Sequence, residues 1–344
     1  MKKLWVVLIV LALGAAFLPL WKPVAKKFKW FIVATNIYQD ALRRSGLSSV
    51  QIGFKQERDP AQAAQDLRHI NRTFDSYMEH AALTPAALEG KEVLEIGTGE
   101  NLGVALRFLA AGARRVVCLE KFVPFQNTPY TRDLYLALRE QLPPEQRARF
   151  DAAIDLSKEV KPDETRLQYL RRSVEDAEIL TRKSSFDLVV SNAVLEEVYD
   201  TDTAFAAMDS VLKPGGYSLH KIDLRDYGMF TNQGFHPLEF LTIPDGIYRY
   251  MAESVGQPNR RLVDYYRNKM AQLGYQATLF TTAVLARPDL SPHKTVLRRG
   301  VDYTDTELDL IRQIRPRLLE RYRALPDEDL LVAGIFLMGR KPGP

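Results

Sequence analysis

The sequence predicts an α/β protein built on a doubly wound, mostly parallel sheet. Short apolar runs typical of buried parallel strands recur along the chain, and stretches with helical spacing separate them. The first run, at residues 93–96, leads into a glycine-rich turn at residues 97–103, after which a helical pattern continues. Glycine lets the backbone turn sharply and approach a ligand closely. The helix that follows would direct its N-terminus at the same ligand.

Length and composition agree with one α/β domain plus additional segments. The chain has 344 residues, which leaves about a hundred beyond the needs of a single domain of this class. The net charge of +4 is small, and no basic helix interleaved with aromatic residues is visible, which argues against a nucleic-acid partner. The single cysteine, Cys118, lies inside a predicted strand and cannot form an internal disulfide. The five histidines show no ligand-like spacing, so no metal site is expected.

Residues 1–30 are predicted to form an N-terminal membrane anchor. Residues 4–21 are uncharged and nearly all apolar, and a helix of this length can cross a bilayer core. Lysines flank the run, and Trp21, Trp30 and Phe31 stand where interfacial anchors are usual. More lysines follow the run than precede it, which predicts that the following domain faces the cytoplasm. A cleaved signal peptide is the alternative, although Gly14–Ala16 lies inside the apolar run rather than after it.

Residues 31–87 are predicted to form a helical linker or N-terminal lid. A helix is expected from about residue 59, with Pro60 near its first turn. Tyr77 and His80 on this helix are candidates for contacts with a ligand of the main domain. The apolar residues at helical spacing are expected in the core instead: Leu67, Ile70, Phe74 and Met78.

A carboxylate precedes the glycine-rich turn. Glu95 stands two residues before Gly97, and Thr98 and Gly99 follow. The third glycine, Gly103, comes one residue later than in the G-x-G-x-x-G turn that binds dinucleotides. The turn therefore departs from the dinucleotide pattern while keeping a bare backbone at the mouth of the predicted pocket.

A second carboxylate ends the second predicted strand. Residues 115–119 are an apolar run, and Glu120 and Lys121 follow it. In a doubly wound sheet, an acid at this position can accept hydrogen bonds from both hydroxyls of a ribose. A long connection at residues 121–172 comes next, with helical patterns near residues 132–141 and 144–154. It is interpreted either as an acceptor-binding lid or as a packing pair of helices.

Two further motifs follow in the second half of the domain. Residues 186–192 have the pattern of a central strand that leaves polar residues, among them Asn192, at the edge where open sheets bind ligands. This strand leads into the segment AVLEEV, which contains Glu196 and Glu197. Residues 211–217 (VLKPGGY) are predicted to form a turn before the fifth strand.

Taken in order, these four segments resemble the motifs of the class I S-adenosylmethionine (SAM)-dependent methyltransferases. The resemblance covers residues 88–221 well and extends to the C-terminus as topology. It implies a Rossmann-like sheet of seven strands in a domain spanning residues 88–344, with the third strand at residues 167–170 and the sixth at 274–285. The last strand, at residues 330–338, would be antiparallel. Glu196 and Glu197 stand where the family often has a histidine, so that residue's role is not transferred.

The resemblance also implies SAM as the cofactor. Glu95 would hold its amino-acid end and Glu120 its ribose, while Glu175 or Asp176 would meet the adenine amino group. Because SAM is a cytoplasmic metabolite, this agrees with the orientation predicted for the anchor. The cofactor-binding residues implied are Glu95, Gly97, Thr98, Gly99, Glu120, Lys121, Asn192 and either Glu175 or Asp176.

His220 and Asp223 are the candidate catalytic residues. An oxygen acceptor needs a base for its proton, and the ordinary pKa of a histidine suits that task. Asp223 would orient His220 or replace it, and a purely structural role is the alternative for His220. The surrounding segments resemble methyltransferases of bacterial polysaccharide and glycolipid pathways, which implies a small-molecule, saccharide or lipid-linked acceptor. Further candidates for the acceptor pocket are His236, Arg260 and Arg261.

Two other classes of function are considered. An NAD-dependent oxidoreductase also uses a glycine turn and a later acid, but it predicts the G-x-G-x-x-G spacing and does not predict the two later motifs. A non-catalytic, membrane-tethered domain that keeps the same fold is the other alternative. The intact set of Glu95, Gly97, Gly99 and Glu120 argues against it.

Overall fold

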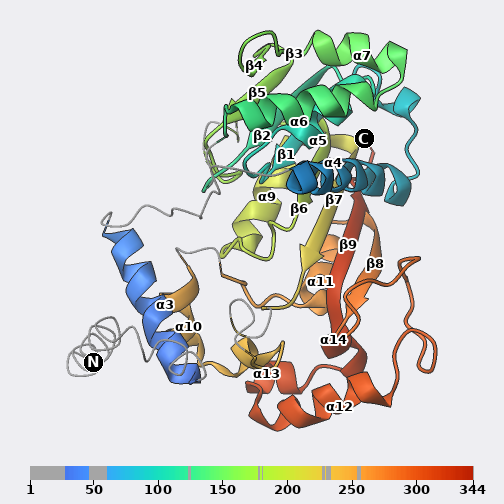
Figure 1. Ribbon diagram of the computed structural model, residues 1–344. Helices are drawn as coiled ribbons and strands as arrows, with labels where there is room; N and C mark the ends of the chain where they lie inside the picture. Colours follow the sequence, from blue (N-terminus) through green and yellow to red (C-terminus); the bar gives the residue numbers. More distant parts are fainter. Residues whose placement is uncertain are drawn as a thin grey trace.

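The computed structural model describes residues 28–45, 60–122, 125–176, 179, 181–226, 229, 234–253 and 257–343. Its centre is a seven-stranded sheet with the order β5-β2-β1-β6-β7-β9-β8 (Figure 1). The strands from β5 to β7 in this order run parallel, whereas β9 is antiparallel to both β7 and β8. The predicted sheet, with its antiparallel last strand, is confirmed.

The strands lie close to their predicted positions. Those of the sheet are β1 (Glu92–Ile96), β2 (Arg115–Leu119), β5 (Leu167–Leu170), β6 (Phe186–Asn192), β7 (Leu212–Asp223), β8 (Gln276–Val284) and β9 (Val332–Arg340). The LKPGG stretch differs from the prediction, because it lies within β7 instead of preceding the strand. Its residues fall where the register between β6 and β7 shifts, and Gly215 takes a φ of 76° there. The predicted turn is therefore an irregularity inside a longer strand.

Helices cover both faces of the sheet. Successive strand residues point to opposite faces, so that Val93 and Leu94 belong to two different hydrophobic cores. The first core, which contains Val93, includes Phe108 and Phe150. The second core, which contains Leu94, includes Phe205. The first core is covered by α4 (Pro60–His80), α5 (Gly103–Ala110), α6 (Pro129–Glu140) and α7 (Pro144–Asp151), and the second by α9 (Thr201–Val211) and α11 (Val263–Gln272).

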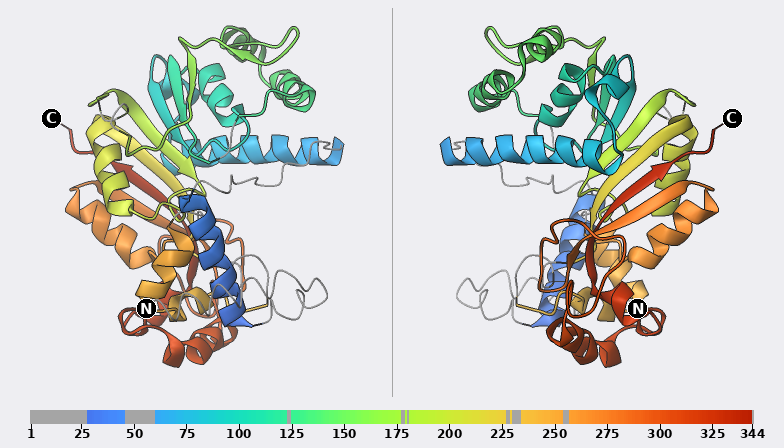
Figure 2. Two further views of the ribbon diagram at one scale, coloured as in Figure 1. Left: turned by 90° about the vertical axis from the view of Figure 1, so that its left-hand side faces the viewer. Right: turned by 90° about the vertical axis from the view of Figure 1, so that its right-hand side faces the viewer.

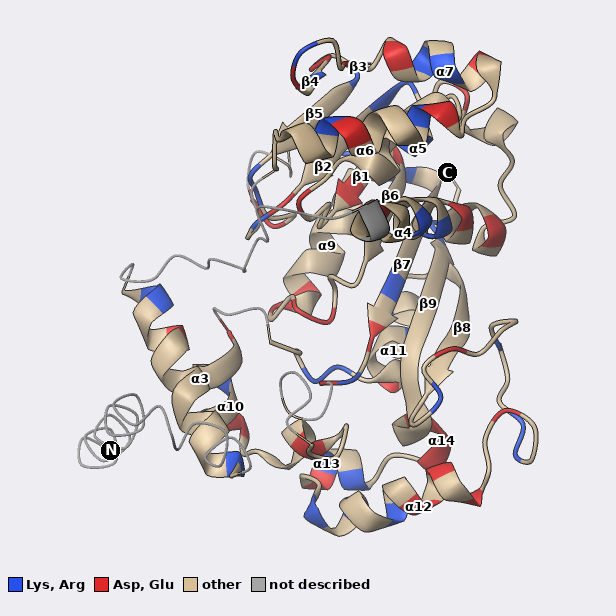
Figure 3. Ribbon diagram, viewed as in Figure 1, with Lys and Arg blue, Asp and Glu red and all other residues tan. Residues whose placement is uncertain are grey.

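The long connection of residues 121–172 contains α6, α7 and two short antiparallel strands, β3 (Ile154–Asp155) and β4 (Lys161–Pro162). Leu134, Tyr135 and Phe150 of the two helices are fully or nearly fully buried in the core that α5 shares. Charged residues of both signs lie together on α6 and α7 (Figure 3), and Arg139 donates to Asp151 across the pair at 2.6 Å. This arrangement agrees with a packing pair of helices.

A second group of helices lies apart from α4 to α7, in the lower part of the view in Figure 1. Helix α3 (Lys29–Arg44) runs beside α10 (Asp245–Ala252), as both side views show (Figure 2). Ile32, Val33 and Ile37 of α3 are buried in the same core as Met251 of α10. Around them lie η3 (Glu239–Thr242), α12 (Asp305–Ile314), η4 (Arg315–Arg317), α13 (Glu320–Arg323) and α14 (Asp327–Leu331), while η1 (Pro85–Leu88) precedes β1.

The predicted membrane anchor falls outside the described residues. Its apolar run at residues 4–21 and Trp21 belong to the undescribed part of the chain. Within the described ranges, no helix combines the length and the apolar character that a bilayer crossing requires. Trp30 lies in α3 with an exposed side chain, and Phe31 follows it, partly buried.

Candidate functional site

A cavity of about 650 Å³ opens at the carboxyl ends of β1, β2, β5 and β6. This is the edge at which open α/β sheets bind ligands. The loops after these strands form its walls, together with the first half of α4 and with Glu253 at the end of α10. Eight of the predicted cofactor-binding residues line it: Glu95, Gly97, Thr98, Gly99, Glu120, Lys121, Glu175 and Asn192.

The glycine turn is closely fitted against the loop that follows β6. Gly97 has a φ of +74°, and a Cβ at this position would lie 2.1 Å from Cγ2 of Val194. Its N–H donates to the Leu119 carbonyl at 2.7 Å, which ties the turn to the end of β2. Beside it, the Thr98 hydroxyl is buried and has no hydrogen-bond partner among the described residues. Such a group is costly to leave unpaired, so a bound ligand would satisfy it.

Glu120 shapes the turn while it faces the cavity. Its Oε2 accepts a hydrogen bond from the Gly99 N–H at 3.0 Å, and its Oε1 accepts one from the Phe122 N–H at 2.7 Å. A carboxylate offers about four acceptor sites. Glu120 therefore fixes two backbone segments while its side chain lines the cavity.

Glu95 lies deeper in the same cavity. Burial raises the pKa of this carboxyl to about 8. The thiol of Cys118 donates to it at 3.8 Å, and burial together with the nearby Glu95 raises the pKa of that thiol well above its usual range. Glu95 therefore holds its proton at neutral pH. A ligand ammonium group beside it would favour the charged carboxylate again.

The structure distinguishes the two acids after β5. Glu175 lines the cavity and accepts a hydrogen bond from the Ser173 hydroxyl. Asp176 is not among the lining residues; its carboxylate accepts from the Ser173 N–H at 3.1 Å and lies 4.0 Å from Arg172. Of the two alternatives left open by the sequence, Glu175 has the position required for a contact with the ligand.

Helix α4 contributes a wall of the cavity through residues that the sequence analysis did not identify. Four of its residues line the cavity: Asp66, His69, Ile70 and Thr73. Their helical spacing places them on one face, but the sequence gives no sign of which face meets the cavity. Tyr77 and His80, the candidates on this helix, do not line it. Tyr77 is buried against Phe108, and His80 stacks on Phe336 at 3.9 Å.

His220 does not lie in the cavity, which contradicts its assignment as the base. It is fully buried within β7, with Nδ1 2.7 Å from the Ser191 hydroxyl and Nε2 2.6 Å from the Ser218 hydroxyl. Burial lowers the pKa of the imidazole to about 3. The alternation of the strand directs the ring to the face covered by α9, where it meets Phe205 edge-on at 6.3 Å. His220 is a satisfied structural histidine.

Asp223 is also placed away from the acceptor. It does not line the cavity, and its two carboxylate oxygens accept from Nε and Nη2 of Arg225 at 3.0 and 2.8 Å. Its backbone N–H donates to Oε1 of Glu196 at 3.3 Å. Asp223 therefore supports the loop after β7 and is not positioned to orient a base in the cavity.

The two adjacent glutamates after β6 occupy different environments. Glu196 is buried, and burial raises the pKa of its carboxyl well above the usual range. Glu197 lines the cavity, and partial burial together with the charge of Glu120 raises the pKa of its carboxyl to about 7. Glu197 is the cavity acid whose functional potential the sequence analysis missed. The signal available was its position directly after a strand that ends at the ligand edge.

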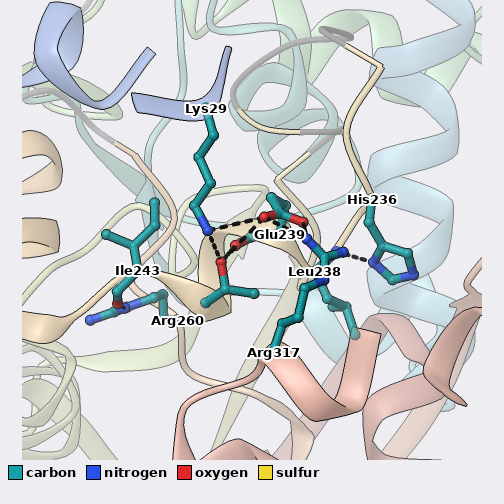
Figure 4. A network of polar contacts seen from close by, with 8 residues as sticks. Lys29, His236, Leu238, Glu239, Ile243, Arg260 and Arg317 are labelled. Carbon is teal, nitrogen blue, oxygen red and sulfur yellow. Dashed lines mark hydrogen bonds and ion pairs between the residues drawn. The ribbon is translucent and has the colours of Figure 1, made fainter. Parts of the chain in front are cut away.

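The other acceptor candidates lie elsewhere. Arg260 and Arg261 line a second hollow of about 630 Å³, which shares Tyr199 with the first. The Arg260 guanidinium stacks on Tyr248 at 3.8 Å and donates to the Ile243 carbonyl at 2.7 Å (Figure 4). It also pairs with Asp245, so burial and bonding assign it a structural task. Arg261 pairs with Asp202 at 3.6 Å.

His236 is likewise fixed by the protein. Its Nδ1 accepts from the Leu238 N–H at 3.0 Å (Figure 4), and its Nε2 lies 3.1 Å from the Leu310 carbonyl. It lines neither hollow. The expectation that His236 belongs to the acceptor pocket is therefore not supported.

Comparison with known families gives one match, and it includes part of the cavity wall. Residues 143–219 match the methyltransferase domain family. The match begins before α7 and ends within β7, so it includes β5, β6 and the loops after them. The resemblance to the class I SAM-dependent methyltransferases is confirmed. No curated protein matches this chain.

Several solved structures overlap more loosely with the chain. A SAM-dependent methyltransferase from Mesorhizobium loti shares 17% identity, with 79% of this chain and 100% of that chain covered and a TM-score of 0.40. A phosphoethanolamine N-methyltransferase from Haemonchus contortus shares 14% identity over 79% of this chain and 53% of that chain, with a TM-score of 0.40. The [4+2]-cyclase SpnF shares 15% identity over 92% of this chain and 95% of that chain, with a TM-score of 0.41. Overlaps this loose bear on neither activity nor substrate.

Proposed function

We propose that this protein transfers the methyl group of SAM to a polar acceptor. The observation that supports this most directly is the meeting of Glu95, the turn at Gly97–Gly99 and Glu120 in one cavity at the ligand edge of the sheet. The family match covers the adjoining wall. Together they favour cofactor binding over a cavity left by packing.

The residues present fit the proposed cofactor. Gly97 provides space that any side chain would fill, and the buried Thr98 hydroxyl has no hydrogen-bond partner among the described residues. Glu120 offers acceptor oxygens to two ribose hydroxyls, while Glu95 is positioned to take an ammonium group. The excess of acids in the cavity suits a ligand that carries positive charges on nitrogen and sulfur.

SAM, when bound, supplies a methyl group on a sulfonium sulfur. The task of this chain is then to hold the two reactants in line and to exclude water, which can lower a barrier by about 7–11 kcal/mol. Glu120 and the glycine turn would fix the cofactor, and α4 and the loop after β6 would enclose the reacting end. The hollow left beside these groups would receive the acceptor.

We further propose a hydroxyl of a saccharide or of a membrane-linked glycan or lipid as the acceptor. The sequence resemblance to polysaccharide and glycolipid methyltransferases supports it. The apolar run at residues 4–21 and the lysines that flank it support attachment to a membrane, with the cavity in the cytoplasm. SAM, a cytoplasmic metabolite, is available on that side.

The cofactor proposal is tested by thermal stability in the presence of ligands. At a concentration 100 times its Kd, a ligand adds about 2.7 kcal/mol to the free energy of unfolding. We expect SAM and its demethylated product, S-adenosylhomocysteine, to raise Tm by several degrees and NAD to leave it unchanged. Stabilisation by NAD alone would instead support the oxidoreductase alternative.

A pair of glutamate variants localises the effect. E120A removes the expected ribose contact and the acceptor for the Gly99 and Phe122 N–H groups, so it should abolish the shift caused by SAM. E164A changes an exposed glutamate outside the cavity lining and should keep the full shift. Retained affinity in E120A, measured by calorimetry, would contradict the proposed site.

A further inference from the structure

We propose that Glu197 is the group that accepts the proton of the methyl acceptor, and that this acceptor is an uncharged or cationic molecule that attacks through a hydroxyl or a neutral amine. The inference rests on the proposed function and assigns the base that His220 cannot be. It depends on three properties of the cavity: the place of Glu197, its lack of partners, and the charges around it.

The position of Glu197 is fixed by the loop between β6 and α9. Ala193 opens this loop with a φ of 55°, a left-handed conformation uncommon outside glycine. The Glu197 N–H then donates to the Val194 carbonyl at 2.9 Å, and Asp200 caps α9 by accepting from the Thr203 N–H at 3.1 Å. Backbone strain of this kind is held in place by the surrounding structure. The loop therefore holds Glu197 in the cavity wall, beside Val194 and the glycine turn.

Glu197 is also the cavity acid with an uncommitted carboxylate. Among the described residues, the carboxylate of Glu197 has neither a hydrogen bond nor an ion pair. Asp66 accepts from the Tyr130 hydroxyl at 2.7 Å, and Glu253 pairs with Arg44 at 2.8 Å. The remaining acids have contacts as well: Glu95, Glu100, Glu120, Glu175 and Asp200. The Glu197 side chain is exposed to the solvent of the cavity and is therefore available to a ligand bound there.

The surrounding charges favour a positively charged or neutral acceptor. Acidic segments lie at the cavity end of β1 and on the loop that enters α9 (Figure 3). The charged and titratable side chains of the wall are Asp66 and His69 of α4, Glu95 and Glu100 around the glycine turn, Glu120 and Lys121 after β2, Arg172 and Glu175 after β5, Glu197, Tyr199 and Asp200 after β6, and Glu253 of α10. An anionic acceptor would face a strong excess of carboxylates and be repelled.

The chemical step balances with the residues present. A lone pair of the acceptor oxygen or nitrogen forms the new bond to the methyl carbon, while the electrons of the carbon–sulfur bond return to sulfur. The proton of the attacking O–H or N–H passes to the Glu197 carboxylate. Burial and the charge of Glu120 bring the pKa of Glu197 to about 7. A base with a pKa near the operating pH is the efficient one.

The first test measures transfer of radiolabelled methyl groups from SAM into membranes of the source organism. The wild-type rate should rise with pH through about 7, because Glu197 must be ionised, and E197Q should lower it about 10²-fold or more. E196Q is the matched control: Glu196 is buried outside the cavity lining and glutamine reproduces its shape, so the rate should stay within about threefold. H69Q removes the histidine of the cavity wall: a pH profile retained in H69Q excludes His69 as the titrating group, and a profile lost in H69Q would overturn the proposal. An E197Q variant with unchanged rate and pH profile would overturn the proposal.

The second test does not require the acceptor. Calorimetry over pH 5.5–8.5 compares the affinity for SAM with that for S-adenosylhomocysteine, whose sulfur is uncharged. An ionised carboxylate at the reacting end favours the sulfonium, so the preference for SAM should grow about tenfold more across this range in the wild type than in E197Q. Identical pH dependence in the two proteins would contradict a place for Glu197 beside the sulfur. Loss of binding of both ligands in the wild type would instead reject the proposed function.

Discussion

At the residue scale, the polar groups at the strand ends divide according to burial. Glu95 and Glu197 face the cavity, and both have a pKa raised toward neutrality by loss of solvent. His220 lies within the same sheet but on the face that α9 covers, where burial lowers its pKa. Burial disfavours the charged form of acids and bases alike, so it raises the pKa of the two glutamates and lowers the pKa of the histidine. Only the acids have access to a ligand.

This division predicts how stability depends on pH. The pKa of His220 is about 3 in the folded protein, below its usual value of about 6.5. The stability contributed by neutral His220 is therefore complete above about pH 6.5, and up to roughly 5 kcal/mol is lost as pH falls toward 3. Urea unfolding of H220Q should show a shallower loss over this window than the wild type. At pH 7.5 it should cost about 1–3 kcal/mol through the altered bonds to Ser191 and Ser218.

The same variant separates the structural role from the catalytic one. Because His220 does not line the cavity, H220Q should bind SAM with an affinity within about threefold of the wild type once folded. An H220Q protein with unchanged stability at every pH but no methyl transfer would restore His220 as a catalytic residue. Both readings use the same purified protein.

Sequence reasoning succeeded at residues whose task is local and failed where a second element decides. Gly97 and Gly99 follow a strand and must turn, so their place in the cavity was predictable from neighbours in the chain. The strand period places His220 on the same face of β7 as Ile222. It could not predict that α9 covers that face, because this contact joins segments remote from each other in sequence. Glu197 was missed although it directly follows a strand that ends at the ligand edge, because the sequence does not show which of the two adjacent glutamates faces the cavity.

At the element scale, buried strands were the most predictable parts. Strands β1, β2 and β6 are short apolar runs covered on both sides, so their bounds could be placed to within a residue or two. Helix α4 was predicted as a helix that could contact the ligand, but through Tyr77 and His80 and not through the residues that line the cavity. Helix α3 was assigned to a linker or lid, and its packing along α10 was not predicted. Amphipathic spacing predicts that a helix packs but not its partner.

The docking of α3 predicts a non-additive effect on stability. Glu239 is almost fully buried and is bound by two cations, Lys29 of α3 at 3.0 Å and Arg317 at 2.9 Å (Figure 4). Either cation alone keeps this carboxylate paired, whereas loss of both leaves a buried charge without compensation. In urea unfolding, K29A and R317A should each cost about 1 kcal/mol. The double variant should exceed their sum by about 1–2 kcal/mol.

A surface pair provides the matched control for that cycle. Arg312 and Asp309 form an ion pair within α12 in which both side chains are exposed. R312A and D309A should therefore add within about 0.5 kcal/mol, because solvent screens the pair. Strict additivity of K29A and R317A as well would mean that Glu239 does not depend on either cation. The proposed coupling of α3 to the rest of the protein would then be wrong.

At the scale of the whole molecule, the chain joins the cavity to its N-terminal segment through α3. The apolar run at residues 4–21 precedes Lys29, the first residue of α3, by only a few positions. The end of α3 approaches the cavity, since Arg44 pairs with Glu253 and Arg43 stacks over Phe122 at 5.9 Å. A membrane attached at the first segment would therefore be connected to the cavity wall by one helix. This connection suits an acceptor that resides in the membrane.

The final prediction concerns that attachment. A helix over residues 4–21 would rise about 27 Å, close to the thickness of a bilayer core of about 30 Å. We expect the full-length chain to stay with membranes after an alkaline carbonate wash. Replacing Ile9 and Leu11 with arginine should release it, because each charge at the centre of a span costs about 2.5–3.5 kcal/mol. Replacing Lys26 and Lys27 with arginine keeps the flanking charge and should leave the protein attached. A shortened protein in the wash, with a new N-terminus near residue 20, would establish a cleaved signal peptide instead and reject the anchor.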